Sequence, residues 1–236
     1  MSPTVAPYGT WKSDITPETL TERSVVLSQV RLDGPDIYWV EDNPRRPGRS
    51  VLLRRDAMQQ TREVLPLLEG ARLPHVKTNV HGRGGRAYAV KDGVIVFNDG
   101  LDGRVYMTRV AARHRRLTVL TPLRSGLFGD FELDLARGVV YAVREQEIEG
   151  DDEPENTLVA IPLDGSAARD GDQIRTVFSG TDFTSSPTLS PDGTKLAWLT
   201  WNHPEMPWTK SELHVGELSA LGHATSDIVL VDHEGV

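Results

Sequence analysis

The sequence contains no cysteine among its 236 residues. This absence excludes a disulfide framework and any zinc site built on thiolates, and it is weakly typical of a reducing compartment. No stretch approaches the roughly 20 apolar residues that a membrane-spanning helix requires. The opening residues, MSPTVAPYGTWKSD, lack the basic start and the apolar run of a secretory signal. Together these absences predict a soluble cytoplasmic protein.

Positive charge is in the minority, because 26 Lys and Arg face 34 Asp and Glu and leave a net charge of −8. We therefore expect neither nucleic acid nor an anionic membrane as a partner. Two basic clusters, at 45–46 and 113–116, are interpreted as solvated loops between strands. The acidic segment 145–155, EQEIEGDDEPE, lacks the spacing of a calcium-binding loop and is interpreted in the same way.

Several catalytic motifs are also missing. There is no G-x-S-x-G, the nucleophile elbow of an α/β-hydrolase, and there is neither H-E-x-x-H nor a Walker loop. Residues 82–87 fit G-x-G-x-x-A, but an apolar strand follows them where a dinucleotide site requires a helix. The sequence predicts no catalytic residue, no cofactor and no metal site in this chain.

Helical periodicity is scarce. One short helix is possible over 16–22, with Thr16 as the N-cap and Pro17 at the first helical position. A second helix is possible over 54–68. Elsewhere the pattern is that of short strands.

What the sequence does contain is a repeat, in which a turn with glycine leads into an apolar strand. The pattern occurs four times, with the apolar strands at 37–40, 94–97, 139–143 and 196–200. A strand precedes each turn and further strands follow, giving four strands in every 45–57 residues or so, which is typical of a β-propeller blade. A β-sandwich with a similar number of strands is the alternative.

The repeat predicts an all-β fold, an incomplete β-propeller of about four blades with an irregular N-terminal arm. The arm covers 1–24, and the partial propeller covers 25–236. The expected blades are listed by their residue ranges: 25–66, 80–121, 128–179 and 184–232.

Two segments carry a resemblance to a known family. SPDGTKLAWLTW, at 190–201, resembles a propeller blade of the TolB and prolyl-oligopeptidase kind, and WNHPEMPW, at 201–208, resembles the S9 serine peptidases. The resemblance is to the bacterial dipeptidyl aminopeptidase and acylaminoacyl peptidase group, and it extends back to YGTWKS at 8–13. In that family a propeller precedes an α/β-hydrolase domain with a Ser-Asp-His triad. The resemblance implies that this chain ends where such a propeller is little more than half built.

The chain departs from the family in two places. S9 propellers of this group commonly have H-E-Y-G-G-G where this chain has HGRGGR at 81–86. They usually have W-D-x-x-x-L-W where this chain has Trp208-Thr209 and, further on, Leu213-His214.

The resemblance implies a propeller that gates the access of short peptides to a hydrolase domain, and it predicts that this chain alone is inactive. The residues expected to frame the substrate cavity are Trp201, His203, Trp208, His81 and Arg83. In another interpretation, the two tryptophans only anchor their loop and the histidine forms local hydrogen bonds. A non-enzymatic binding module and an inactive truncated paralogue are the alternative functions. An open arc of blades also predicts possible self-association.

Overall fold

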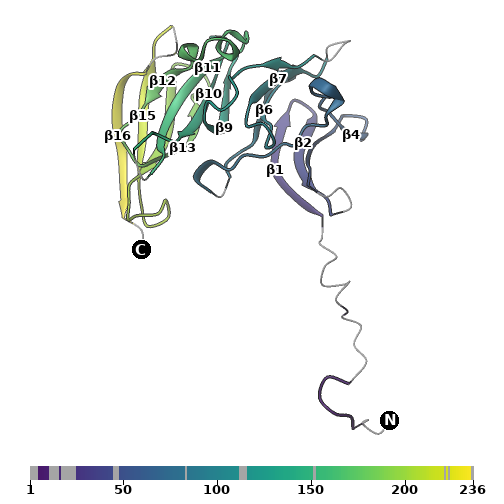
Figure 1. Cartoon of the computed structure of the whole chain (residues 1–236). Coiled ribbons are helices and arrows are strands. Elements are labelled where there is room, and N and C mark those ends of the chain that lie inside the picture. The colour runs from purple at the N-terminus through teal and green to yellow at the C-terminus, as the bar shows by residue number, and fades with distance from the viewer. Residues whose placement is uncertain are drawn as a thin grey trace.

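The computed structural model describes residues 5–10, 16, 25–44, 48–82, 84–111, 116–150, 153–220, 222 and 224–234, with the side chains of 225–234 excepted. These residues form four separate sheets of four strands each, arranged as an arc (Figure 1). Within each sheet every strand pairs antiparallel with the next strand in the sequence. We refer to the four sheets as blades 1 to 4.

Blade 1 consists of β1 (Val26–Asp33), β2 (Asp36–Asp42), β3 (Ser50–Arg55) and β4 (Thr61–Glu63). Blade 2 consists of β5 (Tyr88–Lys91), β6 (Val94–Asn98), β7 (Val105–Arg109) and β8 (Thr118–Val119). Blade 3 consists of β9 (Leu127–Asp134), β10 (Val139–Gln146), β11 (Glu155–Pro162) and β12 (Arg175–Phe178). Blade 4 consists of β13 (Phe183–Leu189), β14 (Lys195–Trp201), β15 (Lys210–Leu218) and β16 (Ala224–Glu234).

The middle strands of blades 2 and 3 are apolar on both faces, because each of these two blades packs between two neighbours. All five residues of β6 are buried, as are the first five of β10. One apolar core joins blades 1 and 2, a second joins blades 2 and 3, and a third joins blades 3 and 4. The continuous burial of β6 and β10 explains why these segments lack the alternation of a half-exposed strand.

The first strand of a blade carries a repeated irregularity. In blades 1, 3 and 4 the pairing of the first strand with the second shifts at one position, occupied by Gln29, Asp130 and Ser186 respectively. At all three residues φ is close to +55°, in the left-handed region. A β-bulge of this kind turns the side chain away from the regular alternation and re-aims it.

The predicted all-β propeller arrangement of four blades is confirmed, and the β-sandwich alternative is wrong because the described chain forms four sheets rather than two. The possible helix over 54–68 is also wrong. That region holds the end of β3 and then β4, and the three-residue 3-10 turn η1 (Glu69–Ala71) begins just after it. Pairing of β3 with β4 and burial of Val64 in the core of blades 1 and 2 outweigh the local helical tendency. Of the possible helix over 16–22, all but Thr16 lies outside the described residues.

The remaining helical elements in the described part of the chain are the 3-10 turns η2 (Val80–Gly82), η3 (Ser166–Ala168) and η4 (Gly171–Gln173). In the residues that the structure covers, no helix has the length and apolarity needed to cross a membrane.

Candidate site at the ends of blades 3 and 4

The structure brings three of the five candidate residues together at one end of blades 3 and 4. His81 lies in η2, on the connection between blades 1 and 2. Trp201 ends β14, and His203 follows it in the loop that leads to β15. The three rings share one neighbour, Phe183 at the start of β13. We call His81, Phe183, Trp201 and His203 the aromatic cluster.

Stacking and edge contacts hold the aromatic cluster together. The rings of Phe183 and Trp201 are stacked with their centroids 5.2 Å apart, as expected for residues paired across β13 and β14. The imidazole of His81 meets both rings edge-on, at 5.4 and 5.5 Å. His203 contacts the Phe183 ring edge-on at 4.9 Å. Such edge and offset arrangements are the favoured ones for aromatic pairs.

His81 is held by a carboxylate from blade 3. Its backbone amide donates a hydrogen bond to Glu145 Oε2 at 2.7 Å, and its φ of +58° lies in the left-handed region. The ring atom Nε2 is buried and makes no hydrogen bond. Burial lowers the pKa of this imidazole, while the carboxylates of Glu145 and Asp130 oppose that shift. The ring is therefore neutral at physiological pH.

His203 links the loops of blades 3 and 4 in a more exposed position. Its Nε2 lies 3.3 Å from Glu153 Oε2, with 53% of the histidine side chain exposed. Its backbone amide donates to Asp182 Oδ2 at 2.7 Å, and the amide of Asp182 donates to Asn202 Oδ1 at 2.7 Å. These two hydrogen bonds join the segment just before β13 to the loop just after β14.

The two tryptophans have different environments. Trp201 is 9% exposed and anchors its loop, in agreement with the interpretation of this residue as a structural plug. Trp208 is 64% exposed, so the plug interpretation does not fit it. The fifth candidate, Arg83, lies outside the described residues.

The glycines beside His81 form a tight turn. A Cβ on Gly84 would lie 2.8 Å from the carbonyl oxygen of Thr78, and φ at Gly84 is +77°. The strand β5, and not a helix, follows this turn. The G-x-G-x-x-A match is therefore a turn into a blade, because a dinucleotide site needs a helix N-terminus at this point.

Sequence reasoning missed the partners of the two histidines. The acidic segment 145–155 was expected to be a solvated loop, yet its first acid, Glu145, caps His81 and its Glu153 pairs with His203. Phe183 could have been found from the antiparallel register, because a strand that ends at Trp201 places its partner at the start of β13. Nothing in the sequence indicated that a connection between blades 1 and 2 would reach blade 4.

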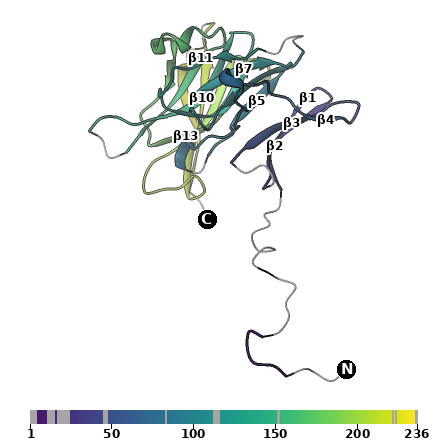
Figure 2. The same ribbon diagram turned by 45° about the vertical axis from the view of Figure 1, so that its right-hand side comes forward.

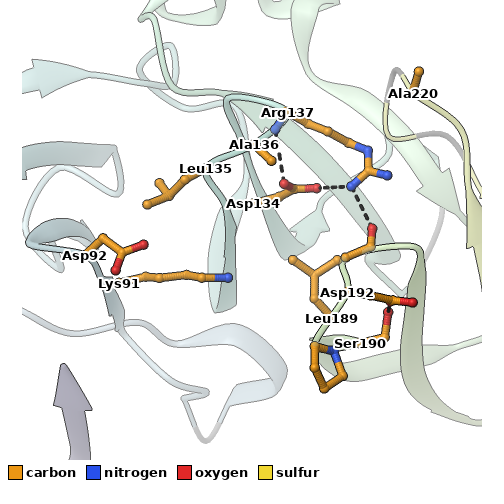
Figure 3. Close-up of a pocket in the computed structure, with 12 residues that line it drawn as sticks. Lys91, Asp92, Asp134, Leu135, Ala136, Arg137, Leu189, Ser190, Asp192 and Ala220 are labelled. Carbon is orange, nitrogen blue, oxygen red and sulfur yellow. Dashed lines mark hydrogen bonds and ion pairs between the residues drawn. The ribbon is translucent and has the colours of Figure 1, made fainter. Parts of the chain in front are cut away.

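A pocket of about 480 Å³ lies at the opposite end of these strands. It is lined by the turns between the first and second strands of blades 2, 3 and 4 (Figure 3). Arg137 closes one side of it, donating to Asp134 Oδ2 and to the carbonyl oxygen of Gly193, both at 2.8 Å. Lys91 and Asp92 lie on the other side. Because Arg137 joins blade 3 to blade 4, the pocket wall is a contact between blades.

The arrangement suits binding rather than metal chemistry. Imidazole rings, aromatic faces and carboxylates lie together at this end of blades 3 and 4, and all three groups can contact a polar ligand. Within the ranges that the structure describes, no cluster of three or more His, Asp or Glu could hold a metal ion.

Solved structures similar to this chain have related architectures. Two crystal structures of puromycin hydrolase, one of a mutant complexed with PGG, are 30% identical to it, with TM-scores of 0.85 and 0.84. A puromycin-hydrolyzing peptidase of Mycobacterium tuberculosis is also 30% identical, with a TM-score of 0.80. Each match covers 98% of this chain and 36% of the other, so this chain spans about a third of their length.

More distant structures show the fold alone. A TolB of Agrobacterium tumefaciens matches at 11% identity with a TM-score of 0.54, and an acylaminoacyl peptidase of Pyrococcus horikoshii at 10% with 0.55. No protein-family model and no curated protein sequence matches the chain. The resemblance expected from the sequence is confirmed by the solved structures.

Proposed function

The chain is similar to the β-propeller portion of S9-family serine peptidases, and on that premise we propose that it is the substrate-gating portion of such an enzyme. In this role the propeller covers an active site carried by an α/β-hydrolase domain, its partner in the full-length protein. It admits only short or unstructured peptides and orients their N-terminal end. Acyl transfer through Ser, His and Asp, with an oxyanion hole, belongs to the hydrolase domain. The observation that carries the proposal is the 30% identity to puromycin hydrolase over 98% of this chain.

In this proposal the aromatic cluster and Trp208 frame the peptide's path, together with Arg83. Buried Trp201 and half-buried His81 form the fixed floor of the site, whereas His203 and Trp208 are exposed and can meet a ligand. Glu145 and Glu153 stand beside the histidines, which suits the ammonium group of a peptide.

We propose that residues 1–24 form an arm and 25–236 the propeller, with blades at 25–66, 80–121, 128–179 and 184–232. The bounds of the strands support this division, since the sheets run from Val26 to Glu63, Tyr88 to Val119, Leu127 to Phe178 and Phe183 to Glu234.

We further propose the specificity, chemistry and location of the full-length protein. The specificity would be that of a dipeptidyl aminopeptidase or acylaminoacyl peptidase, the chemistry that of a serine protease, and the location the cytoplasm. The chain itself would self-associate, because the outward faces of its first and last blades are apolar.

The experiment is a titration of the chain with tri-alanine, followed by tryptophan fluorescence, with N-acetylated tri-alanine as the comparison. We expect a saturable change in the millimolar range that is weaker for the acetylated peptide. A Trp208→Phe variant removes the exposed reporter and should abolish most of the change if the peptide lies beside this loop. Labelling with a fluorophosphonate should give no product, because the nucleophile belongs to the hydrolase domain.

If neither peptide changes the tryptophan fluorescence, the gating role is contradicted and a binding module for another ligand is favoured. Stoichiometric labelling of one serine by the fluorophosphonate would contradict the assignment of catalysis to another domain.

A further inference from the structure

The connection from blade 1 to blade 2 is hydrogen-bonded to both blades at residues 74–77. Figures 1 and 2 show these two blades side by side at one end of the arc. Val76 forms an isolated antiparallel bridge with Asp99, which directly follows β6 of blade 2. The amide of Val76 also donates to the carbonyl oxygen of Ser50, the first residue of β3 in blade 1, at 3.0 Å. The connection therefore joins the start of β3 to the end of β6.

The backbone of His75, within this connection, is held by blade 2. Its amide donates to Oδ1 of Asp99 at 2.8 Å, and its carbonyl oxygen accepts from the amide of Gly100 at 2.7 Å. Asp99 is fully buried and forms an ion pair with Arg72 at 2.8 Å. The backbone at His75 is therefore fixed to blade 2 independently of its side chain.

The ring of His75 is bound to blade 1 instead. Its Nδ1 accepts a hydrogen bond from the backbone amide of Ser50 at 2.8 Å. Because a backbone amide can only donate, Nδ1 carries no proton and the proton of the neutral ring lies on Nε2. The protonated ring has a proton on both nitrogens, so this bond exists only while the ring is neutral.

The contact leaves no room for the ring to adapt in place. A Cβ on Gly100 would lie 2.9 Å from Cδ2 of His75, so the ring packs closely against blade 2 on that side. Turning the ring over about its bond to Cβ would exchange Nδ1 with Cδ2, and the amide of Ser50 would then face a carbon atom that cannot accept. A ring that gains a proton at Nδ1 therefore has to separate from Ser50.

Charged groups face His75 from each element packed around it: Lys77 on the connection, Arg49 just before β3, Asp42 at the end of β2 and Asp99 just after β6. Burial lowers the pKa of His75 below its ordinary value of 6.5, and the cations Lys77 and Arg49 lower it further. The carboxylates of Asp99 and Asp42 oppose this shift. The ring is therefore neutral at physiological pH, and the bond to blade 1 is formed.

The two acids near the ring already have other partners. The positive charge of Arg72 offsets that of Asp99, and the hydroxyl of Ser50 donates a hydrogen bond to Asp42. Both contacts weaken the attraction of these carboxylates for a protonated ring. The environment of His75 therefore favours the neutral ring while the contact is closed.

We propose that His75 is an acid-sensitive link between blades 1 and 2, in which a proton gained at Nδ1 breaks the bond to the Ser50 amide and releases the start of β3 from the connection. The proton comes from water, and no bond between heavy atoms changes. Contacts between the first strands of the two blades remain, since Gln29 accepts from the amide of Ala87 at 2.7 Å. Acid therefore loosens blade 1 on one side only. This inference goes beyond the gating role and does not depend on peptide binding.

The test follows the full chain by nuclear magnetic resonance from about pH 8 to about pH 5, with labelled amide and histidine nitrogens. The signals of the His75 ring and of the Ser50 amide should change with one shared midpoint below the ordinary pKa of histidine. The amides of β10 in blade 3 should keep their positions, because the release is local. A His75 ring that gains its proton while the Ser50 amide signal stays unchanged would overturn the proposal.

His75→Asn provides a link that acid cannot open, because its side-chain oxygen takes the place of Nδ1 and accepts at every pH. The rate of hydrogen exchange at the Ser50 amide is compared between the unchanged chain and this variant. Their ratio should be about tenfold larger at about pH 5 than at about pH 8, since only the released ring binds a proton freely. His203→Asn is the matched control, as this histidine lies in blade 4 and its removal should leave the exchange at Ser50 unaltered.

His75→Ala removes the acceptor altogether and should give the Ser50 amide fast exchange already at about pH 8. If this variant does not fold, the comparison with His75→Asn still decides. A ratio of exchange rates that does not change with pH would overturn the proposal. Loss of the native β10 signals together with that of Ser50 would also overturn it, because the whole chain would then be unfolding.

Discussion

The carboxylate of Asp130 in blade 3 accepts a hydrogen bond from the backbone amide of Ser186 in blade 4, with Oδ2 and N 3.0 Å apart. The other oxygen, Oδ1, accepts from the amide of Arg86 in the segment entering blade 2, at 2.8 Å. The Asp130 amide in turn donates to the carbonyl oxygen of Arg86 at 2.9 Å. One residue, held in a bulge with φ of +54°, therefore ties three blades together.

We expect Asp130→Ala to destabilise the chain by about 2–4 kcal/mol, because it leaves two backbone amides without their charged acceptor. Asp130→Asn should cost less, since it keeps one acceptor oxygen and tolerates a left-handed backbone. Thermal melts and urea titrations measure both variants. Asp164→Ala is the control, as Asp164 is solvent-facing and bonds only to the nearby Ser166. Equal melting temperatures for Asp130→Ala and Asp164→Ala would contradict the bridging role.

Trp201, at the end of β14, and Trp208, in the loop that follows, should respond differently to truncation. Trp201→Ala removes a ring stacked on Phe183 and is expected to cost about 3–5 kcal/mol. Trp208→Ala, at a largely exposed position, should change stability by only about 0.5 kcal/mol. Urea unfolding followed by circular dichroism compares them, and similar midpoints would show that the burial of Trp201 contributes little.

The turn at Gly84 allows steric and conformational costs to be separated. Gly82 and Gly84 both have a positive φ, but only Gly84 has a neighbour in the way, the Thr78 carbonyl oxygen. Gly82→Ala should therefore cost about 1–2 kcal/mol for the left-handed backbone alone, and Gly84→Ala distinctly more. The melting temperatures of the two variants test this order of stability. A Gly84→Ala chain that melts at a higher temperature than Gly82→Ala would exclude the close contact.

His81 should make stability depend on pH. Burial lowers its folded-state pKa below the ordinary value of 6.5, so below that pH the unfolded chain binds a proton that the folded chain resists. Stability is unaffected by this group well above pH 6.5 and is lost as the pH falls from 6.5 towards the folded pKa. The melting temperature of the unchanged chain should therefore fall more steeply between pH 8 and about pH 5 than that of His81→Asn.

Comparing the unchanged chain with His81→Asn at each pH removes the contributions of other titrating groups to the pH dependence of stability. His75, whose pKa burial also lowers, acts in the same direction in both. Glu132 acts in the opposite direction, because burial raises its pKa and the folded state keeps its proton longer as the pH rises. Since both groups are present in each chain, parallel melting curves would mean that His81 does not titrate differently on unfolding.

Blades were predictable from the sequence because their signals are local. The turn at Asp192-Gly193 and the apolar run that follows lie within a dozen residues, and the amide of Gly193 bonds to the Ser190 carbonyl oxygen as such a turn requires. The aromatic cluster was only partly predictable. Trp201 and His203 were expected from the family resemblance of their loop, whereas Phe183 and Glu145 enter only through strand register and the packing of one blade on the next.

The hydrogen bonds of Asp130 to the neighbouring blades could not be predicted from the sequence. Gly129 is a local signal for the bulge that Asp130 occupies, but the hydrogen-bond partners of Asp130 are 44 and 56 residues away and have no local signal. From the sequence alone, an aspartate in a strand is interpreted as solvent-exposed. Its role as an acceptor is visible only once the neighbouring blades are placed beside it. Packing of the blades also determines which of the two tryptophans is buried: Trp201 is buried and Trp208 is exposed.

The contact of His81 with Phe183 and Trp201 connects the segment between blades 1 and 2 to blade 4, past blade 3. In a repeat array whose units contact only their neighbours, the terminal unit can unfold while the rest stays folded. A link that skips a unit removes that freedom, because blade 4 cannot detach without releasing the segment before blade 2. We therefore expect blade 4 to unfold together with blades 2 and 3 rather than separately from its end of the arc.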